Sequence, residues 1–297
     1  MKQTFLGSVY LSLAASIWGG MYVVSKYVLD YIPPITLVWL RFIIAFIVLF
    51  AILRAVQTRT GKQVQLKKRD WILLGWIGFI GYFISISFQF IGTKLSDAHT
   101  GALITSATPA FIVIFAILVL KEKLTARKTI SMLLATTGVV IVIGWETKVG
   151  HHLTGSLILV GAAITWALLS IYVKIASERF STLTITTFAI GFGLLFTTPV
   201  MLWELQSQNV FFHNIWVVLG IVYLGTVSTA GAFFLWNKGM ELMDAGVGSL
   251  FFFFQPVVGT FLGWLLLNEE IHANFFIGAI LIFAGVLIVT VKRNEAS

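Results

Sequence analysis

Long apolar stretches alternate with short polar breaks from one end of the chain to the other. A helix needs about 20 apolar residues to cross the roughly 30 Å of hydrocarbon in a bilayer. Stretches of about that length occur at residues 5–29, 35–55, 70–92, 98–120, 127–145, 154–177, 182–203, 213–236, 244–267 and 272–291. The breaks between them carry charged residues, glycine or proline, so the pattern predicts an all-α membrane protein with ten transmembrane helices.

The composition excludes a water-soluble fold. Of the 297 residues, 58% are hydrophobic and 11% are charged, whereas soluble domains have about 45–50% and about 25%. The mean hydropathy is +0.96. The chain has no cysteine, which excludes a disulfide-rich scaffold and thiol chemistry.

The basic residues predict the orientation in the membrane. Ten spans place both termini on the same side. If that side is the cytoplasm, inside segments hold 15 of the 20 Lys and Arg residues, and outside segments hold only Lys94 and Lys148. The positive-inside rule therefore predicts cytoplasmic N- and C-termini. The net charge of +8 is then explained by orientation and by anionic lipid, and no nucleic-acid partner is expected.

The second half of the chain repeats the first. At an offset of 147 or 148 residues, equivalent positions hold the same residue in the pairs Gly7/Gly155, Trp18/Trp166, Lys26/Lys174, Gly92/Gly239, Asp97/Asp244, Pro109/Pro256, Glu122/Glu269 and Gly138/Gly285. We therefore expect one five-helix repeat over residues 1–148 and a second over 149–297. Five is odd, so the second repeat would have inverted topology, with a central cavity between the repeats. A duplication kept only for packing is the alternative.

These features resemble a known family. Each repeat has a Trp in its first helix, a Pro inside its fourth and a Leu-x-Glu sequence at the end of the fourth, at Leu120–Glu122 and Leu267–Glu269. This pattern resembles the drug/metabolite transporter (DMT) superfamily and its ten-helix EamA-type branch, over nearly the whole chain. The resemblance implies a bacterial plasma-membrane carrier that works without ATP, often an exporter of amino acids or other metabolites. It also implies a cavity lined mainly by helices one to four and six to nine.

Polar and aromatic residues within the spans are the candidates for substrate binding. Trp18 and Tyr22 share one helix face with Lys26, and Trp166 and Ser170 share one with Lys174. Arg41 lies about two turns inside its helix and needs an acceptor, which could be a carbonyl, a hydroxyl or a substrate carboxylate. The full candidate set is Trp18, Tyr22, Arg41, Tyr82, Ser85, Gln89, Thr105, Thr108, Trp166, Ser170, Trp236, Phe252 and Gln255. Packing between helices is the alternative role for each.

Two prolines and four charged residues have open roles. Pro109 and Pro256 lie inside the fourth and ninth spans and could form either hinges for gating or static kinks. Lys26 and Lys174 lie near span ends, where snorkelling toward the interface is the simpler reading. For Glu122 and Glu269, at the ends of helices four and nine, a structural role is favoured over chemistry.

No motif indicates an enzyme, a cofactor or a metal site. The chain lacks nucleotide-binding loops and the zinc-protease and serine-hydrolase motifs, and its histidines and acidic residues fall at span ends, in loops or in the tail. Proton coupling, if present, would use Asp97, Asp244 or His99; uncoupled transport is the alternative.

Together these observations predict a secondary transporter. It would move a small organic molecule, such as an amino acid or a similar amphipathic metabolite, outward across the plasma membrane. A drug exporter of the same fold and a non-transporting membrane subunit or sensor are the alternatives.

Overall fold

The computed structural model describes residues 2–61, 65–95, 104–105, 107–143, 153–208, 210–212, 214–267 and 273–290. All regular secondary structure in these residues is helical. The helices of the first half are α1 (Lys2–Leu29), α2 (Pro34–Thr60), α3 (Lys68–Ile77), η1 (Gly78–Ser85), α4 (Ile86–Leu95), α6 (Thr108–Leu120) and α7 (Ala126–Ile143). Those of the second half are α8 (Leu153–Ser177), α9 (Thr182–Glu204), α10 (Ile215–Tyr223), η3 (Leu224–Gly231), α11 (Ala232–Leu242), α12 (Ala245–Ser249), η4 (Leu250–Phe253), α13 (Phe254–Leu267) and α14 (Ala273–Thr290).

The expected count of ten membrane-spanning helices is met only in part. By length and composition, seven helices among the described residues can cross a membrane. The expected spans 98–120, 127–145 and 272–291 correspond to α6, α7 and α14, which are not among these seven. The described apolar parts of α6 and α14, Thr108–Leu120 and Ala273–Ile288, are shorter than a membrane-spanning helix. Part of span 98–120 lies outside the described residues. The chain is a multi-pass membrane protein, and the regular structure of its described residues is all helical.

The third helix of each half has the same irregularity. Residues Gly78–Ser85 of η1 and Leu224–Gly231 of η3 are wound as π-helix between α-helical segments. The two segments lie 146 residues apart, within one or two residues of the offset of the sequence repeat. Short π-segments are rare and occur frequently at functional sites, so the shared position indicates that the repeat extends to the detailed backbone path.

The two halves also pack through equivalent contacts. A Cβ atom on Gly92 would lie 2.7 Å from Cγ of Leu159, so α4 approaches α8 closely. At the equivalent place, a Cβ atom on Gly239 would lie 2.4 Å from Cγ of Leu11, where α11 meets α1. The same interface is therefore made twice with the halves exchanged, as a twofold axis between them would produce.

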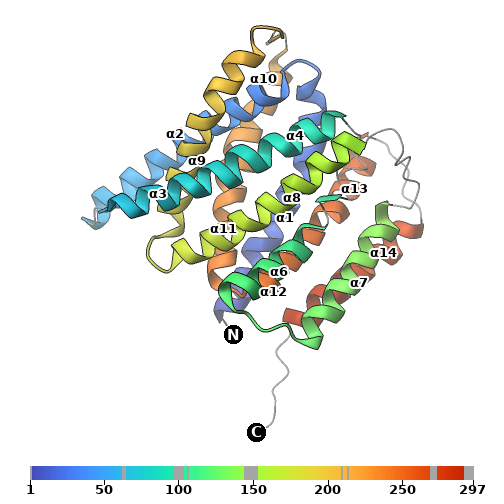
Figure 1. The fold of residues 1–297 in the computed structure, drawn as a ribbon. Helices are drawn as coiled ribbons and strands as arrows, with labels where there is room; N and C mark the ends of the chain where they lie inside the picture. The colour runs from blue at the N-terminus through green and yellow to red at the C-terminus, as the bar shows by residue number, and fades with distance from the viewer. Residues whose placement is uncertain are drawn as a thin grey trace.

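Helices α7 and α14 form a pair at one side of the bundle (Figure 1). A Cβ atom on Gly138 of α7 would lie 2.6 Å from the carbonyl oxygen of Gly278, and one on Gly285 of α14 would lie 2.8 Å from the carbonyl oxygen of Ser131. Each helix thus presents a glycine to the backbone of the other. The start of α1 and the end of α14 lie at the same end of the bundle (Figure 1).

Candidate substrate site

A cavity lies between the two halves. It is lined by Trp18, Met21, Arg41, Ser85, Ile86, Gln89, Thr105, Thr108, Ala162, Ala163, Trp166, Phe233, Phe252 and Gln255, which come from helices of both halves. The centre of a water-sized molecule can reach about 30 Å³ inside it. One water needs about 10–15 Å³ by this measure, so the accessible space in this conformation corresponds to about two waters.

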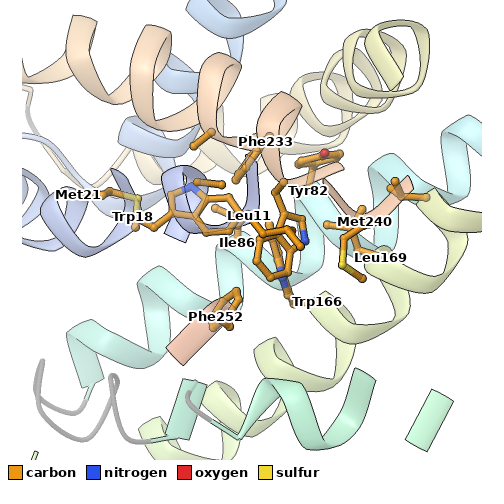
Figure 2. Packing of buried hydrophobic residues seen from close by; sticks show 14 of the residues in the cluster. Leu11, Trp18, Met21, Tyr82, Ile86, Trp166, Leu169, Phe233, Met240 and Phe252 are labelled. Atoms are coloured by element: carbon orange, nitrogen blue, oxygen red, sulfur yellow. The ribbon is translucent and has the colours of Figure 1, made fainter. Parts of the chain in front are cut away.

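An aromatic cluster lies at the cavity, and all of its members except Trp236 form one wall of it. Its members are Trp18, Trp166, Phe233, Trp236 and Phe252, and Figure 2 shows four of them converging from different helices. The rings of Trp18 and Trp166, at equivalent positions of the two halves, are 5.4 Å apart with an interplanar angle of 86°. The ring of Trp18 also lies 5.5 Å from Phe233, 5.4 Å from Trp236 and 6.0 Å from Phe252. Trp18 is therefore the centre of the cluster.

The indole nitrogens of the cluster are not equally satisfied. Nε1 of Trp18 donates to the carbonyl oxygen of Ser228, in the π-helical segment η3, at 3.0 Å. Nε1 of Trp166 and Nε1 of Trp236 are buried and have no hydrogen-bond acceptor among the described residues. Since Trp166 lines the cavity and Trp236 does not, Trp166 has the indole that a molecule in the cavity could use as a donor.

Arg41 brings a positive charge to the cavity. It lies in the second turn of α2 and is only 1% exposed. Its Nε donates to Oγ1 of Thr229 at 3.1 Å, Nη2 lies 3.3 Å from Sδ of Met21, and the guanidinium lies 5.3 Å from the centre of the Phe90 ring. These contacts are with neutral groups and fix the guanidinium at the cavity wall, where it would favour an anionic group on a ligand.

Uncharged polar side chains complete the lining. Gln89 and Gln255 supply amides, and Thr105 and Thr108 supply hydroxyls. The hydroxyl of Ser85 donates to the carbonyl oxygen of Ala162, on the opposite half, at 2.9 Å. The cavity thus combines an aromatic wall with several groups able to bond a polar ligand.

Three residues proposed from the sequence lie beside the cavity instead of lining it. The hydroxyl of Tyr82 accepts from Nδ2 of Asn237 at 3.0 Å, and the tyrosine is fully buried. Ser170 donates to the carbonyl oxygen of Trp166, in the preceding turn, at 3.2 Å. Trp236 is buried against Trp18 and Phe252. The side chain of Tyr22 lies outside what the structure describes.

Five lining residues were missed because they are apolar or small. They are Met21, Ile86, Ala162, Ala163 and Phe233. The repeat relates two of them, since Ile86 and Phe233 are equivalent positions. Polarity identifies neither residue, so only the structure shows that this pair lines the cavity.

Each proline lies near the start of a helical segment. Pro109 is the second residue of α6, which begins at Thr108. Pro256 is the third residue of α13 and follows the 3₁₀ segment η4. Proline is tolerated in a first turn because the amide there needs no partner within the helix. An α-helical segment therefore begins one residue before Pro109 and two residues before Pro256. A hinge at either position stays a prediction.

Charged clusters lie away from the cavity. No group of three or more potential metal ligands occurs among the residues that the structure describes. Asp244, one of the candidates for proton coupling, lies 3.7 Å from Nζ of Lys128 beyond the end of α11. Asp97 and His99 lie outside the described residues.

Comparison with known proteins gives a consistent result. The EamA-like transporter family matches the chain twice, over residues 5–144 and 153–291. The uncharacterized transporter YetK of Bacillus subtilis is 31% identical over 96% of this chain and 88% of its own length. A probable amino-acid metabolite efflux pump of Salmonella typhimurium is 25% identical over 93% of this chain and 92% of its own length.

The fold has a counterpart among solved structures. One crystal structure matches with a TM-score of 0.78 and covers 95% of both chains at 21% sequence identity. At this identity the likeness concerns the fold alone.

Proposed function

We propose that this chain, which belongs to the EamA-like transporter family, is a secondary transporter. In this proposal it exports an amino acid or a similar amphipathic metabolite across the bacterial plasma membrane. The observation that carries this proposal is the cavity between the two halves. Its aromatic wall suits an apolar side chain, and the guanidinium of Arg41 and the amides of Gln89 and Gln255 suit a carboxylate and an amine. The efflux pump of Salmonella supports an amino-acid metabolite as substrate.

In this proposal the chain crosses the membrane ten times as two inverted repeats, with both termini in the cytoplasm. The basic segments support this orientation, and the glycine contacts repeated at Gly92 and Gly239 support a twofold relation between the repeats. Inverted repeats allow alternating access by an exchange of their conformations around one site. Because the cavity has room for only about two waters, substrate entry requires such a rearrangement.

Transport in liposomes tests the proposal. Purified protein is reconstituted, and uptake of radiolabelled amino acids is measured down a concentration gradient without ATP. We expect saturable uptake of at least one amino acid, and much slower uptake by Trp166→Ala protein of normal thermal stability. Strict dependence on ATP would contradict a secondary mechanism. Transport of cationic drugs with no transport of amino acids would favour the drug exporter.

A further inference from the structure

The carboxylate of Glu122 joins the two halves of the molecule. Glu122 follows α6, in the first half, and its two oxygens accept from the backbone amides of Ala245, at 2.7 Å, and Gly246, at 3.1 Å. These amides open α12, in the second half. The side chain of Glu122 is 12% exposed. A carboxylate is favourable at the start of a helix, where amides lack partners within the helix.

Lys128 strengthens this contact. Its Nζ lies 3.1 Å from Oε2 of Glu122 and 3.7 Å from Oδ2 of Asp244, and its side chain is 9% exposed. A Cβ atom on Gly246 would lie 3.4 Å from Oε2 of Glu122 and 3.5 Å from Nζ of Lys128. The helix start and the ion pair are therefore packed against each other. We call Glu122, Lys128, Asp244, Ala245 and Gly246 the Glu122 cluster.

The neighbouring helix end is held in place as well. Nζ of Lys174, on α8, donates to the carbonyl oxygens of Met240, at 3.1 Å, and Met243. Met240 lies in the last turn of α11, and Met243 is the residue that follows the helix. Lys174 therefore fixes the segment that leads into the Glu122 cluster.

The cluster lies at one end of the bundle, away from the cavity. Thr108, at the start of α6, lines the cavity, and Glu122 is 14 residues further along, or about 21 Å at 1.5 Å per residue. On α8, Trp166 lines the cavity, and Lys174 is eight residues further, or about 12 Å. Between the two levels Leu11, Leu169 and Met240 are fully buried. The cavity is therefore closed toward this end.

We propose that Glu122 is a gating residue. Its bonds to Ala245, Gly246 and Lys128 hold the two halves together at this end, and they must break before the cavity can open there. The proposal rests on the alternating access of the proposed function. The sequence repeat agrees with this role, because the residue equivalent to Glu122 in the second half is also a glutamate, Glu269. If the two repeats exchange conformations, each needs a residue that closes the cavity on its own side of the membrane.

The test measures access to Ser170, which is fully buried on α8 between the cavity and Lys174. Because the chain has no cysteine, Ser170→Cys provides a single thiol for an impermeant maleimide. In inside-out membrane vesicles, which expose the proposed cytoplasmic face, we expect slow labelling. Adding Glu122→Gln should raise the labelling rate about tenfold, because losing a charge-assisted bond increases the open population.

Glu241→Gln is the matched control. Glu241 accepts from Lys238 at 2.6 Å and from the hydroxyl of Thr182, so both of its partners belong to the second half. We expect the labelling rate of Ser170→Cys to stay unchanged in this variant. An unchanged rate with Glu122→Gln, or an equal increase with Glu241→Gln, would overturn the gating role. No substrate is needed, so this outcome is independent of whether amino acids are transported.

A second variant covers the case in which Glu122→Gln does not fold. Lys128→Gln keeps the Glu122 carboxylate and its bonds to the amides of Ala245 and Gly246, and it removes only the ion pair. In the Ser170→Cys background we expect it to raise the labelling rate as well, by a smaller factor than Glu122→Gln. An unchanged rate in folded Lys128→Gln protein would contradict the proposal.

Discussion

At the scale of single residues, Trp18 and Trp166 show that equivalent positions can have different tasks. Nε1 of Trp18 is bonded to the carbonyl of Ser228, whereas Nε1 of Trp166 has no acceptor among the described residues. A buried donor without an acceptor costs about 1–3 kcal/mol. A ligand that accepts from Trp166 would recover this free energy, so we expect Trp166 to contribute a hydrogen bond to binding and Trp18 to contribute packing.

Phenylalanine variants separate these contributions. Trp166→Phe should weaken substrate binding about tenfold, because about 1.4 kcal/mol of hydrogen-bond free energy is lost. Trp18→Phe should lower the melting temperature and change affinity less, because its indole bonds the backbone. Binding is measured by the ligand-induced rise in melting temperature, with the amino acid identified by transport. Equal losses of affinity in the two variants would show that their indoles do not differ in binding.

Arg41 should set the preference for a carboxylate. Wild-type protein is expected to bind an amino acid more tightly than the corresponding amino-acid amide. Arg41→Gln should reduce this preference about tenfold, since it removes a charge-assisted bond. The measurement is the ratio of the two affinities, which a uniform loss of stability would not change. A ratio that stays at the wild-type value in Arg41→Gln would assign the guanidinium to the contacts with Thr229 and Phe90.

At the scale of helices, glycine at α7 and α14 permits close contact. Gly138→Ala and Gly285→Ala would each bring a methyl group within 2.6–2.8 Å of a backbone oxygen of the partner helix. Each should destabilise the protein by about 1–3 kcal/mol, seen as a lower melting temperature, with little change in substrate affinity because neither helix lines the cavity.

Gly231→Ala is the control for these variants. A Cβ atom there would have Thr226 oxygen at 3.5 Å as its nearest neighbour, an ordinary contact. Its melting temperature should therefore equal or exceed that of the wild type, since alanine favours helix more than glycine does. A similar loss in all three variants would indicate a general sensitivity of glycine positions.

Helix positions were largely predictable because a bilayer demands long apolar runs. The expected helices 35–55 and 182–203 correspond to Pro34–Thr60 and Thr182–Glu204. The winding within a run was not predictable, since η1 is more apolar than α3 and α4 beside it whereas η3 is less apolar than α10, so no common composition marks the two π-segments. Polarity likewise placed Tyr82 on an inward face, but only the structure reveals Asn237 as its partner.

The role of Glu122 illustrates a different limit. Its backbone partners, Ala245 and Gly246, are more than 120 residues away in the chain, and an amide of the main chain leaves no mark in the sequence. The positive charges nearest to Glu122 in the sequence are those of Lys121 and Lys123, whereas its ion pair in the structure is with Lys128. Only the packing of α6 beside α12 brings the carboxylate to its two donor amides in the other half.

At the scale of the whole molecule, cysteine labelling tests the orientation. Thr58, in the last turn of α2, and Ser207, just after α9, are both exposed. They lie at opposite ends of the bundle, because Glu204 at the end of α9 accepts from the amides of Ile35 and Thr36 at the start of α2. In intact cells, an impermeant maleimide should label Ser207→Cys, and it should label Thr58→Cys only after permeabilisation. The positive-inside rule gives this expectation. The reverse pattern would invert the proposed orientation and leave the fold unchanged.

The interfaces at Gly92 and Gly239, which are made twice with the halves exchanged, have a consequence for the resting state. If the repeats were identical, the two conformations of an exchange would have equal free energy, and the protein would spend half its time in each. Any bias must therefore come from positions at which the repeats differ. Two such pairs are Arg41 with Ala189 and Gln89 with Trp236, so the residues that distinguish the halves decide which side of the membrane the empty transporter faces.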